Sequence, residues 1–146
     1  MESKPVEILL IEDDPSDIKL TLKALQKYSL ANKVTVLKDG EEALEFLFSE
    51  GRYEGRDNKN MPKVIFLNLK LPFVDGIEVL RRIKSDESTR RIPVVVVTSS
   101  RENRDIEECY KLGVNSYIVK PIDFEKFLES VSNLGLYWVL MNESPF

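Results

Sequence analysis

The stretch Ile8-Leu9-Leu10-Ile11-Glu12-Asp13 joins a run of four apolar residues directly to two acids. Three further apolar runs end in the same way, each in a residue suited to phosphate or metal chemistry. They are Val64-Ile65-Phe66-Leu67 before Asn68, Val94-Val95-Val96-Val97 before Thr98, and Tyr117-Ile118-Val119 before Lys120-Pro121. Runs this apolar, separated by helix-like stretches, predict parallel strands that are buried on both faces.

The residues that follow these runs define a candidate site. In open parallel sheets, binding sites form at the carboxyl ends of the strands. The two acids, the amide, the hydroxyl and the lysine ammonium should therefore meet in a single cleft.

Strand-like and helix-like segments alternate along the whole chain. The predicted strands lie near 6–11, 34–37, 63–68, 92–98 and 115–119. The predicted helices lie near 15–29, from 40 onward, near 76–85, near 102–112 and after Asp123. Residues 50–62 are polar and charged, which indicates a surface loop. We therefore expect one α/β domain over residues 1–146, a flavodoxin-like (βα)5 three-layer sandwich with a parallel sheet in the order 2-1-3-4-5.

Composition excludes several classes of function. A net charge of -4, with the basic residues scattered, gives no footprint for nucleic acid. The chain has no histidine and one cysteine, so Ser-His-Asp catalysis, histidine metal sites and an intrachain disulfide are excluded. No apolar run approaches the roughly 20 residues of a membrane span, and no secretory signal is visible. We expect a cytoplasmic protein with no membrane partner.

With its strand ends in this order, the chain resembles the receiver domain of two-component response regulators. The matching positions are Glu12-Asp13, the run Asn68-x-x-x-Pro72-x-x-x-Gly76, Thr98 and Lys120-Pro121. Further details resemble the stand-alone regulators of bacterial phytochrome kinases: Glu-Asp-Asp-Pro at 12–15, the insert at 50–62, Ser99-Ser100 and Tyr137-Trp138. The resemblance implies a sensor histidine kinase as partner, and a function in a phosphorelay exerted by protein contact rather than as an enzyme.

One position departs from the family. Residue 68 should be the aspartate that accepts phosphate, and here it is Asn68. An acyl phosphate forms on an ionised carboxylate, and a carboxamide is a poor nucleophile. We therefore expect that this chain is not phosphorylated at residue 68.

The resemblance also implies a Mg²⁺ site. Asp13 matches a metal ligand, Glu12 matches the acid that holds a metal-bound water, and the backbone carbonyl of Lys70 matches the third protein ligand. Asn68 could offer its carbonyl oxygen, but one negative charge is lost relative to aspartate. We predict weaker Mg²⁺ binding than in an Asn68→Asp variant.

Three more residues take family roles by resemblance. Lys120 matches the lysine that pairs with the phosphoacceptor and then with phosphate; facing an amide, it should turn to Glu12 or Asp13. Thr98 matches the hydroxyl that bonds phosphate, and Tyr117 the aromatic that moves with it as a switch. The Lys120-Pro121 bond is a candidate cis peptide, as in the family.

Simpler interpretations exist for each residue. Acids after a strand are commonly helix N-caps, which we favour for Asp14 because Pro15 then takes the first helical position. Glu12 and Asp13 could also be caps, although this leaves two crowded acids without a counter-ion. Taken singly, Thr98 would be a turn residue, Lys120 a solvated cation and Tyr117 an edge aromatic. Cys109 is most simply a small packing residue.

The C-terminal segment is unusually apolar. Residues 134–141 hold four aliphatic residues, a tyrosine, a tryptophan and a methionine, in an extension of the last helix at about 134–146. Exposed apolar patches of this size mark interfaces. We expect a homodimer through the last helix and this extension; the alternative is that the extension folds back on its own domain.

Three functional hypotheses follow. In the first, the chain is a stand-alone receiver that carries a kinase signal by protein contact and is present here in a non-phosphorylatable form, for which an engineered Asp-to-Asn exchange at residue 68 is one explanation. In the second, it is a natural pseudo-receiver that acts as a phosphorylation-independent dimeric scaffold. The third, an enzyme on the same architecture, is disfavoured because the motifs of haloacid-dehalogenase phosphatases and of nucleotide-binding proteins are missing.

Overall fold

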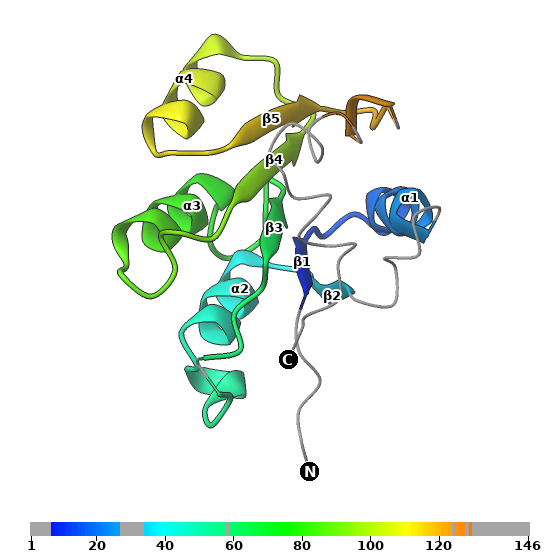
Figure 1. Cartoon of the computed structure of the whole chain (residues 1–146). Helices are drawn as coiled ribbons and strands as arrows, with labels where there is room; N and C mark the ends of the chain where they lie inside the picture. The colour runs from blue at the N-terminus through cyan, green and yellow to red at the C-terminus, as the bar shows by residue number, and fades with distance from the viewer. Residues whose placement is uncertain (1–6, 27–33, 58, 124, 128, 130–146) are drawn as a thin grey trace.

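A computed structural model describes residues 7–26, 34–57, 59–123, 125–127 and 129, and these form the sheet and helices of Figure 1. The five strands are β1 (Ile8–Ile11), β2 (Val34–Leu37), β3 (Val64–Leu67), β4 (Val94–Thr98) and β5 (Ser116–Val119). Every neighbouring pair is parallel, in the order β2-β1-β3-β4-β5. The predicted flavodoxin-like α/β fold and strand order are confirmed.

Helices cover both faces of this sheet. They are α1 (Pro15–Gln26), α2 (Gly40–Leu47), the 3₁₀ helix η2 (Gly51–Tyr53), α3 (Gly76–Ser85) and α4 (Asn103–Lys111), with further helical residues at 125–127. Figure 1 shows α1 on one side of the sheet and α2, α3 and α4 on the other. The chain therefore forms three layers.

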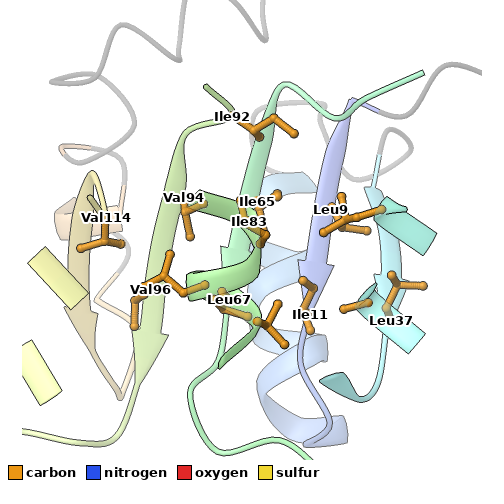
Figure 2. Packing of buried hydrophobic residues seen from close by; sticks show 14 of the residues in the cluster. Leu9, Ile11, Leu37, Ile65, Leu67, Ile83, Ile92, Val94, Val96 and Val114 are labelled. Carbon is orange, nitrogen blue, oxygen red and sulfur yellow. The ribbon is translucent and has the colours of Figure 1, made fainter. Parts of the chain in front are cut away.

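The strand side chains divide between two buried clusters. Leu9 and Ile11 of β1 pack in the cluster under α2, α3 and α4, with Ile83 of α3 (Figure 2). Ile8 and Leu10 pack in the second cluster with Leu25 of α1. This division follows from the strand geometry, because successive side chains point to opposite faces. The continuous apolar runs are thus explained by burial on both sides.

The helix ends agree with the capping signals in the sequence. The Asp14 side chain accepts a hydrogen bond of 2.9 Å from the Ser16 amide, so Asp14 caps α1 as predicted. Gly113 follows α4 with a φ of +100°, the conformation that favours glycine after a helix. The Asp123 side chain accepts from the Glu125 amide at 2.9 Å, as expected for the N-cap of the last helix.

The predicted surface loop at 50–62 is more firmly attached than its polar sequence suggests. The guanidinium of Arg56 lies 4.0 Å from the ring centroid of Phe46, and its Nε donates to the Phe46 carbonyl at 2.8 Å. Tyr53 packs edge-on against the same ring at 5.1 Å. The insert is therefore anchored to α2.

Two predictions fall partly or wholly beyond the described residues. The extension at 134–146, with Tyr137 and Trp138, lies outside them, as does the end of the helix predicted near 15–29. Among the residues that the structure does describe, no helix is both long and apolar enough to cross a bilayer.

Candidate functional site

The carboxyl ends of β1 and β3 bring Glu12, Asp13 and Asn68 together. Ile11 pairs with Leu67 in the sheet, and the Asn68 amide N–H donates to the Ile11 carbonyl at 3.0 Å. Glu12 and Asn68, which follow these two strand ends, are therefore neighbours across the sheet. The side chains of Glu12 and Asn68 are both buried at this edge.

The carboxamide of Asn68 is the centre of a hydrogen-bond network. Its Nδ2 donates to Glu12 Oε2 at 3.0 Å, to Asp13 Oδ1 at 3.2 Å and to the Lys70 carbonyl at 3.1 Å. The opposite orientation of the amide would place its oxygen against three acceptors, so the network fixes the nitrogen inward.

Gly76 allows the loop after β3 to close under this site. Its N–H donates to the Leu69 carbonyl at 2.7 Å, and a Cβ at this position would lie 2.2 Å from the Asn68 carbonyl oxygen. No larger residue fits without moving the backbone at Asn68. The spacing from Asn68 to Gly76 therefore has a steric basis.

Lys120, which follows β5, extends over the same pocket. Its Nζ lies 2.7 Å from Glu12 Oε1 and 2.7 Å from Asp17 Oδ2, and its side chain is 11% exposed. The prediction that Lys120 turns to Glu12 or Asp13 is confirmed for Glu12. Asp17 was missed; its place in the first turn of α1, beside the cap Asp14, was the available signal. The Lys120-Pro121 bond is cis, as expected.

The electrostatics of this ion pair reflect its burial. Desolvation raises the pKa of Glu12, and the ammonium of Lys120 opposes that rise. Burial would also lower the pKa of Lys120, but hydrogen bonds to Asp17 and Glu12 outweigh it and the pKa is raised. Lys120 is therefore held as a cation between two carboxyl groups.

Thr98 and Tyr117 are connected through Ser100. Thr98 is buried at the end of β4, and its Oγ1 accepts from the Ser100 N–H at 3.3 Å. The Tyr117 hydroxyl donates to the Ser100 carbonyl at 3.0 Å, and Ser100 Oγ donates to Asp105 Oδ2 at 2.6 Å. Ser100 therefore links the two predicted switch residues; the sequence indicated Ser99-Ser100 only as part of a resemblance and gave no signal of this link.

Of the predicted site residues, Asp13, Asn68, Lys70 and Lys120 border an open pocket of about 530 Å³. It is lined by Asp13, Asp14, Asp17, Asn68, Lys70, Ser99, Lys120 and Pro121. The described residues contain no cluster of three acidic or thiol side chains able to hold a metal ion. The oxygen donors here are instead two carboxylates and a backbone carbonyl, a set that suits Mg²⁺.

A doubly wound parallel sheet with paired acids and a lysine at its carboxyl edge defines the receiver class of signalling domain. Comparison with known families agrees: the response regulator receiver domain matches residues 8–132. The chain belongs to this family. Receiver domains interact with sensor histidine kinases and bind Mg²⁺ or Mn²⁺ at this site.

Three relatives illustrate the match. A probable methanogenesis regulatory protein, FilR2 of Methanothrix harundinacea, is 38% identical over 141 residues, which cover 97% of this chain and 88% of the relative. Response regulator Rcp1 of Synechocystis sp. is 37% identical over 139 residues, 94% of this chain and 92% of Rcp1. Its Mn²⁺-bound structure aligns with a TM-score of 0.77 and 34% identity, over 97% of this chain and 100% of that one.

The bacteriophytochrome response regulator RtBRR is similar over 97% of this chain and 85% of its own, with a TM-score of 0.83 and 46% identity. The chain is thus homologous to stand-alone phytochrome response regulators, as the sequence details indicated.

Proposed function

We propose that this protein is a single-domain response regulator that works by protein contact and lacks a phosphoryl acceptor at residue 68. The observation that carries the proposal is the position of Asn68. Its carboxamide lies beside Glu12 and Asp13, in a pocket that Lys120 also lines. A receiver has its phosphate-accepting aspartate at this position. An amide there cannot supply the anionic oxygen that attacks phosphorus.

The proposal includes a weakened Mg²⁺ site. Asp13 and the Lys70 carbonyl would be direct ligands, and Glu12 would hold a metal-bound water. These oxygens fit a hard cation, which in related Rcp1 is represented by Mn²⁺. With Asn68 in place of aspartate, the pocket lacks one negative charge, so Mg²⁺ affinity falls.

The proposed partners are a sensor histidine kinase and a second copy of the chain. The dimer contact is assigned to the last helix and the segment at 134–146, whose apolar composition exceeds what one domain edge covers. Thr98 and Tyr117 would carry the switch from the pocket toward α4 and β5, and the protein would act in the cytoplasm.

A second candidate function is a pseudo-receiver that acts as a constitutive dimeric scaffold. It is favoured by one observation, that the Asn68 amide gives both acids a hydrogen-bond donor without any metal. In this case Asn68 is the natural residue. In the first case it replaces an aspartate of a working receiver.

The test is phosphoryl uptake measured by intact mass. The wild-type chain and the Asn68→Asp variant are incubated with a small acyl phosphate and Mg²⁺. We expect one added phosphoryl group in Asn68→Asp and none in the wild type. The matched control is the double variant Asn68→Asp, Asp13→Ala, which should take up little because it loses a metal ligand.

Uptake by the wild-type chain at residue 68 would contradict the proposal. If Asn68→Asp takes up no phosphoryl group although it is folded, the working-receiver interpretation fails and the scaffold remains.

A further inference from the structure

The Asn68 amide nitrogen lies where the oxygen atoms of the pocket converge. Glu12 Oε2, Asp13 Oδ1 and the Lys70 carbonyl are 3.0, 3.2 and 3.1 Å from it. A carboxamide nitrogen carries two protons, so three acceptors share them. These three oxygens are the ones expected to surround the cation, directly or through a water.

Glu12 is already satisfied by this arrangement. Its Oε1 accepts from the Lys120 ammonium, and its Oε2 accepts from the backbone N–H groups of Asp13 and Asp14, at 3.1 and 3.3 Å, as well as from Asn68. Both oxygens of the Glu12 carboxylate therefore have hydrogen-bond donors from the protein itself.

A magnesium ion and the Asn68 nitrogen would compete for the same volume. Mg²⁺ holds oxygen ligands at about 2.0–2.1 Å in octahedral geometry. Asn68 could ligate it only through Oδ1, which requires the amide to turn and its N–H groups to leave all three acceptors. The acceptors would then gain the ion but lose the amide.

We propose that the Asn68 amide is a built-in substitute for the cation, so that residue 68 opposes metal binding instead of contributing a weak ligand. This inference rests on the proposed function in one respect, because it takes the pocket to be the receiver's cation pocket. It goes further because it assigns the Asn68 side chain an unfavourable effect on Mg²⁺ affinity. A chain that merely lost a ligand charge would still bind Mg²⁺ better with Asn68 than with alanine.

The experiment titrates Mg²⁺ into the wild type, Asn68→Ala and Asn68→Ser, by calorimetry and by the shift in unfolding temperature. NaCl at equal ionic strength controls for charge screening. We expect Mg²⁺ to half-saturate Asn68→Ala at a concentration about fivefold below the wild type, the ratio given by one net hydrogen bond of about 1 kcal/mol. Asn68→Ser, whose shorter side chain cannot reach all three oxygens, should also bind more tightly than the wild type.

Wild-type affinity equal to or above that of both variants would overturn the inference. If Asn68→Ala does not fold without metal, Asn68→Ser decides. The result is independent of phosphoryl uptake by Asn68→Asp. Tighter Mg²⁺ binding by Asn68→Ala without uptake by Asn68→Asp removes the working-receiver interpretation and leaves this inference standing. Uptake by Asn68→Asp without tighter Mg²⁺ binding by Asn68→Ala and Asn68→Ser removes this inference and leaves the working receiver.

Discussion

Among single residues, two side chains hold the pocket together: the Lys120 ammonium lies between Glu12 and Asp17, and the Asn68 amide lies between Glu12 and Asp13. The convergence of Glu12, Asp13, Asn68 and Lys120 followed from the strand ends, because parallel strands align their carboxyl ends at one edge. The orientation of the Asn68 amide could not be predicted, since it depends on which acceptors surround it. Asp17 was missed because α1 supplies it from outside the strand ends.

The second counter-ion of Lys120 should contribute to stability. Asp17→Asn removes one of two carboxylates that hold the largely buried Lys120 ammonium, and we expect a loss of about 1 kcal/mol in the free energy of unfolding. Urea unfolding measures it. The exposed Glu107→Gln on α4 is the control and should change stability by less than about 0.5 kcal/mol. Equal values for both variants would show that the Asp17–Lys120 contact contributes nothing.

The single cysteine should be unreactive in the folded protein. Cys109 is fully buried, and burial raises the pKa of its thiol to about 11. The thiolate is the reactive form, so at mildly alkaline pH the folded chain holds the thiol protonated while the unfolded chain ionises. We expect a thiol-specific reagent to modify Cys109 at the rate of unfolding, and much faster in denaturant. Equal rates with and without denaturant would contradict the burial.

At the scale of elements, strand positions and helix caps followed from local signals, and the anchoring of the insert did not. The runs before Glu12, Asn68 and Thr98 predicted their strands because burial on both faces demands continuous apolar residues. Arg56, a charged residue in a polar stretch, gave no signal of its stacking on Phe46. That contact depends on how α2 is placed by the fold.

The approach of α3 to the pocket should depend on Gly76. Gly76→Ala places a Cβ 2.2 Å from the Asn68 carbonyl oxygen and 2.5 Å from Leu69 Cα, both backbone atoms. We expect a loss of about 2–4 kcal/mol by denaturant unfolding, because the loop that carries Asn68 has to move.

Gly55→Ala is the matched control. Its φ of +93° makes a side chain unfavourable, but a Cβ there meets nothing within 4 Å. The cost should stay at about 1–2 kcal/mol, the strain of the left-handed conformation alone. A Gly76→Ala loss no larger than this would contradict the steric account.

For the whole molecule, the apolar composition of residues 134–141 motivates the proposed dimer, and these residues lie outside those described. We expect twice the chain mass at micromolar concentration by light scattering. Trp138→Ser should shift the mass toward the monomer, while the exposed Arg104→Ser on α4 should leave it unchanged. A monomeric mass for the wild type would contradict the dimer.

The Asn68 amide nitrogen points inward, among the acids of the pocket, and each of the proposals above requires this orientation. Solvent exchange of the Asn68 side-chain protons is the experiment that measures it. In nitrogen-labelled protein the two resonances are assigned by their absence in Asn68→Asp, and the exposed Asn103 side chain provides the reference. We expect much slower exchange at Asn68 than at Asn103, and equally fast exchange at both would show that the Asn68 amide does not point inward.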